Sequence, residues 1–81
     1  MKTFGVFLRE KRKLKNITQR ELAESLGYCS GQYISNIERG LANFPNSALK
    51  KLVQKLEISK EEILNQITQE ILNDLNEAFS E

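Results

Sequence analysis

The sequence predicts a single all-α domain of five helices. At 81 residues the chain has the length of one domain. No alternation of apolar and polar residues persists long enough for a strand, whereas signals for helix starts and stops recur at short intervals. With 40% hydrophobic and 28% charged residues, the composition is that of a folded soluble protein. We therefore expect a modest core and no deep catalytic cleft.

The first helix is expected from Thr3 to Lys15. Asn16 ends it, because asparagine tolerates the left-handed conformation at a helix C-terminus. The predicted buried side consists of Phe4, Phe7, Leu8 and Leu14.

Two short helices follow. The stretch TQRE, from Thr18 to Glu21, fits a capping box at the start of the second helix, which ends near Gly27. After a turn, Ser30 is expected to cap the third helix, and Gly40 to end it. The predicted inner residues are Leu22, Ala23 and Leu26 in the second helix, and Ile34, Ile37 and part of Tyr33 in the third.

The fourth helix is expected from about Ser47 to Leu56, after the single proline, Pro45. The stretch SKEE, from Ser59 to Glu62, is a second capping box and opens a last helix that extends to Phe79. The residues expected to be buried by the fourth helix are Leu49, Leu52, Val53 and Leu56.

The net charge of +1 conceals an asymmetry along the chain. Residues 1–56 contain eleven basic and four acidic residues, a net charge of +7, whereas residues 57–81 contain one basic and seven acidic residues, a net charge of −6. The basic part is compatible with a polyanion such as nucleic acid. A basic surface that only faces solvent is the alternative.

The content of cysteine and histidine restricts the chemistry of the protein. Cys29 is the single cysteine and histidine is absent, so the sequence predicts no disulfide, zinc cluster or histidine-based triad. Lysine or carboxylate catalysis is not excluded, but no spacing suggests it. We expect no enzyme, cofactor or metal, and Cys29 is expected to fill a turn position, with a redox-sensing thiol as the alternative.

The start of the chain, MKTFGVFLREKRK, meets charged residues early and shows no signal-peptide pattern, and no stretch approaches membrane-spanning length. We therefore expect a cytoplasmic protein without membrane partners.

The second and third helices are short and joined by a tight turn, which is the arrangement of a helix-turn-helix. In that motif the third helix packs its apolar side inward and presents its other side to the DNA major groove. Gln32 and Asn36 are one helical turn apart and point the same way. Each can bind adenine N6 and N7 through two hydrogen bonds.

The stretches TQRELAESLG and YISNIERG resemble the lambda-repressor-like, Xre-type helix-turn-helix family of bacterial and phage regulators. The resemblance covers roughly Phe4 to Ile58. Two departures are one extra residue in the turn GYCSGQ and one in the loop LANFPN before proline. The resemblance implies a compact five-helix domain with an extended last helix: residues 1–58 form the helix-turn-helix part, and residues 59–81 form a C-terminal helix of the same unit.

The resemblance also implies roles for individual residues. The base-facing positions are Gly31, Gln32, Ser35 and Asn36. Gly31 has no side chain to read with, so it either allows close approach of the backbone or contributes nothing. The expected phosphate contacts are Gln19, Ser30, Tyr33, Arg39 and Asn43, although Tyr33 can instead be part of the core and Gln19 an ordinary exposed residue. Arg12 and Glu38 are implied to form a partly buried structural ion pair.

The last helix has a broad apolar side. From Lys60 to Phe79 it would span about 30 Å, which is longer than a core of this size needs. Asp74 interrupts any heptad, so no long coiled coil is expected. We expect a homodimer interface in which these residues take part: Ile63, Leu64, Ile67, Ile71, Leu72, Leu75 and Phe79. The alternative is that the helix folds back and completes the core.

These observations predict a sequence-specific transcriptional regulator that binds a near-palindromic operator in double-stranded DNA as a homodimer, without a small-molecule ligand. A repressor is the expected type, although the sign of regulation is not readable from the sequence. Phage, plasmid, restriction-modification and antitoxin roles fit equally well. The alternative is a helix-turn-helix scaffold used as a protein-interaction module through its last helix.

Overall fold

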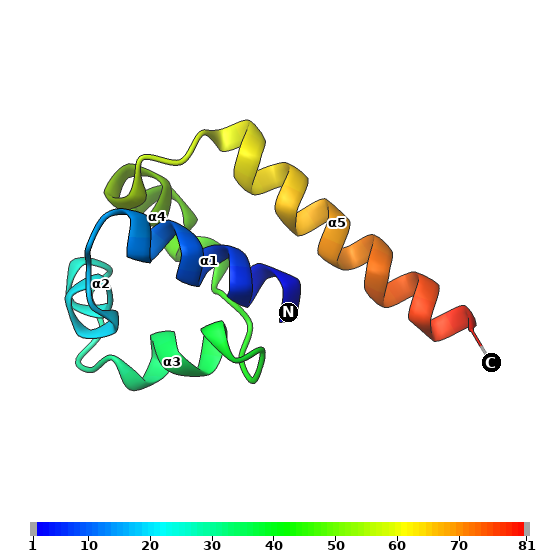
Figure 1. Cartoon of the computed structure of the whole chain (residues 1–81), viewed down its shortest axis with the longest axis horizontal. Coiled ribbons are helices and arrows are strands. Elements are labelled where there is room, and N and C mark those ends of the chain that lie inside the picture. Colours follow the sequence, from blue (N-terminus) through cyan, green and yellow to red (C-terminus); the bar gives the residue numbers. More distant parts are fainter. Residues whose placement is uncertain (1, 81) are drawn as a thin grey trace.

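The computed structural model describes residues 2–80, which form five α-helices, one short 3-10 helix and no β-strand (Figure 1). The all-α prediction is confirmed. The elements are α1 (Lys2–Leu14), α2 (Gln19–Ser25), α3 (Gln32–Glu38), the 3-10 helix η1 (Asn46–Ala48), α4 (Leu49–Leu56) and α5 (Lys60–Phe79). Within residues 2–80, no helix has the length and apolar character needed to cross a membrane.

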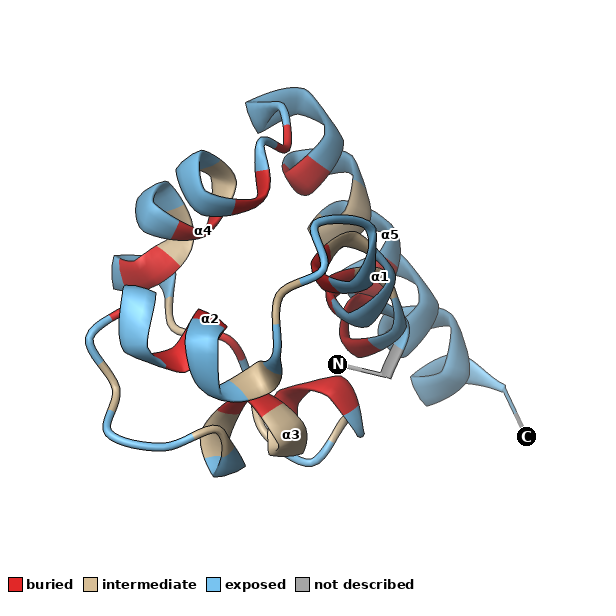
Figure 2. Ribbon diagram, turned by 60° about the vertical axis from the view of Figure 1, so that its left-hand side comes forward, coloured by how far each residue is buried: buried red, intermediate tan, exposed pale blue. Residues whose placement is uncertain are grey.

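The core lies where α1 to α4 meet, and α1 is its central element. Helix α1 packs against α3 and α5, while α2 packs against α3 and α4. Figure 2 shows the buried residues on the sides of the helices that face this interior. Burying each large apolar side chain stabilises the fold by about 1.5–3 kcal/mol. The buried apolar residues are Phe4, Leu8, Leu22, Ala23, Leu26, Ile34, Ile37, Phe44, Ala48, Leu52, Leu56, Ile58 and Ile63.

Several helix boundaries follow the local signals of the sequence. Thr18 and Glu21 form the predicted capping box, with both hydrogen bonds at 3.0 Å. Hydrogen bonding with the Thr18 backbone, and then with its side chain, lowers the pKa of the Glu21 carboxyl. Asn16 has φ of 56°, as expected for a left-handed residue after α1. Glu57 takes the same conformation after α4, with φ of 54°.

The second capping box is only half formed. The Ser59 hydroxyl accepts the Glu62 N–H at 3.1 Å, as predicted. The Glu62 carboxylate, however, pairs with Lys11 of α1, with 2.9 Å between Nζ and Oε2. Lys15, directly after α1, forms another ion pair, with Glu57. Part of the positive charge on α1 is thus paired with the acidic segment.

Three boundary or burial predictions are wrong. Leu14 is 74% exposed, because the buried side of α1 is centred on Phe4, Leu8 and Arg12 and Leu14 lies far from it around the helix. Ser30 does not cap α3, because the helix starts one residue later and Gly31 occupies the N-cap position. The fourth helix begins at Leu49 instead of Ser47, since the preceding residues form η1.

Helix α5 contacts the body through residues between its start and Glu70. Ile63 is 4% exposed and belongs to the core, and Ile67 packs partly against it. Glu70 is 3% exposed and accepts the Thr3 N–H, with distances of 3.1 and 3.3 Å to its two oxygens. The expectation that Ile63 lies on a dimer surface is therefore wrong, because the chain buries this residue in its own core.

Beyond Glu70, α5 projects from the body and its residues are exposed (Figures 1 and 2). This projection makes the molecule elongated, with extents of 41 × 25 × 22 Å. The large exposed apolar side chains of α5 are Leu64, Ile71, Leu72, Leu75 and Phe79.

Gly5 allows α1 and the end of α3 to approach closely. A Cβ atom at this position would lie 2.5 Å from the Ile37 carbonyl oxygen and 2.6 Å from that of Glu38. Any side chain here must push the two helices apart. The glycine therefore fixes the separation between α1 and α3.

We predict that Gly5→Ala lowers the free energy of unfolding by about 1–3 kcal/mol, because the added methyl group overpacks this contact. Helix propensity alone predicts the opposite sign, a gain of about 1 kcal/mol. Urea denaturation followed by circular dichroism measures the difference. Lys13→Ala, on the exposed side of α1, is the control and should change stability by less than about 0.5 kcal/mol. A stabilised Gly5→Ala variant would contradict the close-contact account.

Candidate nucleic-acid interface

The turn between α2 and α3 contains two glycines with different roles. Gly27 has φ of +91°, which only glycine adopts readily. Gly31 is half-buried, and a Cβ there would lie 3.0 Å from the Arg20 nitrogen and 3.2 Å from the Gln19 carbonyl carbon. A side chain at position 31 would thus point toward α2. This gives Gly31 a packing role, while its base-facing role stays a prediction.

Helix α3 has one buried side and one polar side. Ile34 and Ile37 are completely buried against the rest of the domain. On the other side, Gln32 is exposed and Asn36 is half-buried, one turn apart. Ser35, another predicted base-facing residue, is half-buried between the two sides. The apolar residues hold the helix, and the polar ones are available to a partner.

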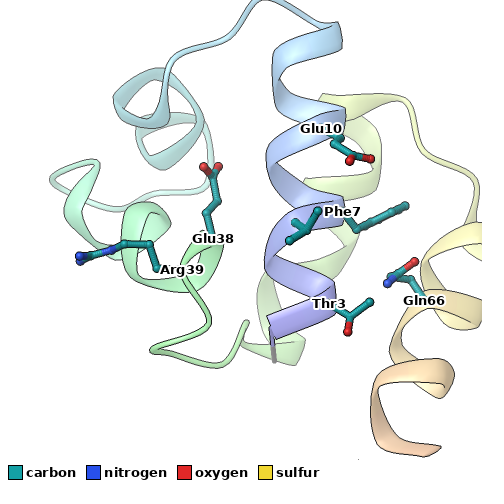
Figure 3. A pocket seen from close by; sticks show the side chains of 7 residues that line it. Thr3, Phe7, Glu10, Glu38, Arg39 and Gln66 are labelled. Carbon is teal, nitrogen blue, oxygen red and sulfur yellow. The ribbon is translucent and has the colours of Figure 1, made fainter. Parts of the chain in front are cut away.

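The polar side of α3 is joined by hydrogen bonds. Gln32 Nε2 donates to Asn36 Oδ1 at 3.0 Å, and Arg39 Nη2 donates to the same oxygen at 2.8 Å. Arg39 is exposed and extends away from α1 (Figure 3). The structure therefore brings three of the predicted DNA-contacting residues into one connected set.

A buried ion pair holds the end of α3 against α1. Arg12 Nε donates to Glu38 Oε2 at 2.7 Å and Nη2 donates to Oε1 at 3.1 Å, and each residue is only 8% exposed. A third donor of Arg12 bonds the Ile17 carbonyl at 2.8 Å. Gln19 Nε2 donates to Glu38 Oε1 at 3.0 Å. The start of α2 is thereby connected to the same pair, and Gln19 has a structural partner in addition to its predicted phosphate contact.

The remaining predicted phosphate residues lie around α3. Ser30 is exposed in the turn, and Asn43 is exposed in the loop after α3. The half-buried Tyr33 hydroxyl donates to the Asn43 carbonyl at 3.1 Å, and its ring meets Tyr28 edge-on at 4.9 Å between centroids. Desolvation, and then the neighbouring Tyr28, raises the pKa of Tyr33. Tyr33 thus connects α3 to the following loop.

Three further surface features were compared with the polar side of α3: a hollow, the grouping of possible metal ligands, and the single cysteine. A hollow of about 600 Å³ lies beside α1, between α5 and the end of α3, and is lined by Thr3, Val6, Phe7, Glu10, Glu38, Arg39 and Gln66 (Figure 3). Within residues 2–80, no three carboxylate, cysteine or histidine side chains gather into a group that could hold a metal ion. Cys29 is a free, exposed thiol in the turn before α3.

Sequence reasoning missed three features. The Asn36–Arg39 bond follows from a spacing of three residues on a helix, so it could have been found. A glycine inside a helical pattern, as at Gly5, was a further signal of close packing. The contact of Glu70 with Thr3 joins residues 67 positions apart and has no local signal.

The fold and the polar side of α3 define a helix-turn-helix DNA-binding domain. The helix-turn-helix family model HTH_3 matches residues 8–63. The chain belongs to this family, the lambda-repressor-like helix-turn-helix DNA-binding regulators. Among curated proteins, no sequence gives a significant match.

Two solved structures of regulators are similar to this chain over most of its length. The clp gene regulator ClgR from Corynebacterium glutamicum has a TM-score of 0.69 and 29% identity, covering 95% of this chain and 86% of its own. The wild-type restriction-modification controller protein C.Esp1396I has a TM-score of 0.63 and 29% identity, covering 84% of this chain and 86% of its own.

We predict that Arg12→Met lowers the free energy of unfolding by about 3–5 kcal/mol, because it leaves Glu38 buried without its counter-charge. Replacing both partners, as Arg12→Met with Glu38→Leu, should cost less than the single change, since no buried charge remains. Chemical denaturation at neutral pH measures both. Arg20→Met, in the exposed pair with Glu24, is the matched control and should cost less than about 1 kcal/mol. Equal losses at positions 12 and 20 would refute the structural role.

Proposed function

We propose that this DNA-binding regulator recognises its operator sequence-specifically, through α3, and binds a near-palindromic site in double-stranded DNA as a homodimer. The observation that carries the proposal is the connected polar side of α3, formed by Gln32, Asn36 and Arg39. The similarity to two solved regulators supports a role in transcription control.

Base reading requires a helix of fixed position with polar side chains on its outer side. Ile34 and Ile37 fix the inner side, and the ion pair of Arg12 with Glu38 fixes the end of the helix. The major groove of B-DNA is wide enough to admit an α-helix, and its base edges present donors and acceptors to amide side chains. Helix α3 therefore has the form and the chemistry of a reading helix.

Exposed basic residues support an attraction between the protein and the phosphate backbone of DNA. Lys11 and Lys15 are paired with acidic residues, but other basic residues are exposed in the first part of the chain. These are Arg9, Lys13, Arg39, Lys50, Lys51 and Lys55, together with Arg20, which pairs with Glu24. Basic residues on such a surface supply affinity that decreases with salt. The acidic C-terminal segment would be repelled by DNA and is expected on the far side.

The dimer is supported by the exposed side of α5. At about 100° per residue, Leu64, Ile71 and Leu75 lie on one side of the helix, which differs from the side that carries Ile63 and Glu70. Phe79, at 87% exposed, extends this apolar side to the end of the helix. A second copy is the proposed occupant. Two copies would place two α3 helices on half-sites about 34 Å apart, and two-fold symmetry would then require a near-palindrome.

Selection of bound fragments from random duplex DNA at near-physiological salt tests the proposal, because nonspecific attraction weakens with salt while base reading persists. An inverted repeat would support both sequence recognition and the dimer. A folded protein that enriches no motif would contradict DNA reading.

The second candidate is a protein-interaction module, favoured by the same exposed apolar side of α5. In that case α5 would hold a different protein, and the polar side of α3 would not be needed. Replacing Gln32 and Asn36 together by alanine distinguishes the two. Loss of function supports DNA reading, and full function supports the interaction module.

We predict that Gln32→Ala relaxes base preference at one or two positions of the operator by about 1–3 kcal/mol, because it removes one reading side chain. Titration of single-base operator variants measures this preference. Lys13→Ala is the control, since it should weaken binding to all variants alike. Unchanged base preferences in Gln32→Ala would show that this side chain does not read the operator.

We predict that Ile71→Asp produces monomers with weakened operator binding, since it places a charge in the proposed dimer contact. Sedimentation gives the mass and titration gives the affinity. Asn73→Asp adds the same charge on the side of α5 opposite Leu64, Ile71 and Leu75 and should leave both unchanged. A dimeric Ile71→Asp variant would exclude this interface.

A further inference from the structure

We infer that Arg39 orients the Asn36 amide so that α3 selects guanine at the base position facing Asn36. The inference rests on the proposed function and adds the base that this position reads. It makes Arg39 a positioning residue that acts through Asn36, beyond its predicted phosphate contact.

The orientation of the Asn36 amide follows from its partners. Arginine has donors only, so the Asn36 atom that lies 2.8 Å from Arg39 Nη2 is the carbonyl oxygen. Gln32 Nε2 donates to the same oxygen at 3.0 Å. An amide oxygen has two lone pairs, and both are used here. Asn36 is left with the two N–H groups of Nδ2 to offer to a ligand.

The pair of Gln32 and Asn36 could not fix this direction alone. Each amide both donates and accepts, so the two could reverse together and keep a hydrogen bond between them. Arg39 selects one of the two orientations, because its guanidinium can donate only to the oxygen of Asn36. The orientation of both amide groups thus depends on Arg39.

This direction determines which base fits. Asparagine reads adenine by accepting from N6 and donating to N7, which requires a free oxygen. The Asn36 oxygen already accepts hydrogen bonds from Gln32 and Arg39. The Asn36 NH₂ group would therefore face the adenine N6 amino group, and two donors cannot form a hydrogen bond with each other. Guanine instead presents two acceptors, N7 and O6, in the major groove. The donor-only Asn36 amide therefore matches guanine.

The experiment uses the whole 81-residue chain and the operator recovered by selection. Asn36→Ala first identifies the facing base pair, as the position where base preference relaxes. Duplexes carrying guanine or adenine at that position are then titrated with the wild type and with Arg39→Met. We expect the wild type to prefer guanine by about tenfold or more, and Arg39→Met to bring the two affinities within about threefold of each other.

Two further variants separate orientation from loss of charge. Arg20→Met removes one positive charge from an exposed pair on α2 and should retain the guanine preference even if overall affinity decreases. Asn36→Asp replaces donors by acceptors at nearly constant size and should shift the preference to cytosine, whose N4 amino group donates.

The inference is overturned if the wild type prefers adenine at this position, or if Arg39→Met keeps the full guanine preference. Either result would leave sequence-specific binding intact. If selection enriches no motif, the proposed function itself fails together with this inference.

Discussion

The buried ion pair between Arg12 and Glu38 holds together the three helices on which recognition depends. Burying two charges is costly, and their attraction compensates only when the remaining donors and acceptors are also satisfied. Here Arg12 also bonds the Ile17 carbonyl, and Glu38 also accepts from Gln19. Helix α1, the start of α2 and the end of α3 are therefore connected through one pair. Any shift of α3 along α1 would break several of these bonds together.

Gly5 and Gly31 complement the ion pair because they allow neighbouring helices to approach closely. Gly5 lets the backbone of α1 approach the last carbonyls of α3, and Gly31 lets the turn approach the start of α2. Close contact excludes water from the charges of Arg12 and Glu38, which strengthens their interaction. The polar side of α3 is consequently presented from a rigid support. The contact of Glu70 with the start of α1 then fixes α5 relative to the same body. A dimer formed through α5 would thus set the spacing between two reading helices.

Sequence reasoning predicted features that have local signals, such as the five helices, the Thr18 capping box and the left-handed Asn16. It failed where tertiary packing decides. Leu14 looks apolar enough for the core, but the buried side of α1 turns toward Arg12 instead. Ile63 fits the apolar pattern of a dimer surface, yet the body of the same chain covers it. For the site, the pattern indicated Gln32 and Asn36 but assigned Arg39 only to a phosphate, whereas in the structure Gln32 and Arg39 both donate to the Asn36 side-chain oxygen.

The occupation of two half-sites by two α3 helices can be tested through Cys29, which is the single cysteine and is exposed in the turn before α3. A DNA-cleaving iron chelate attached to its thiol would cut the bound operator close to each reading helix. The account predicts two symmetric clusters of cuts, about 34 Å or one turn of DNA apart. A single cluster, or cuts spread evenly along the duplex, would contradict it.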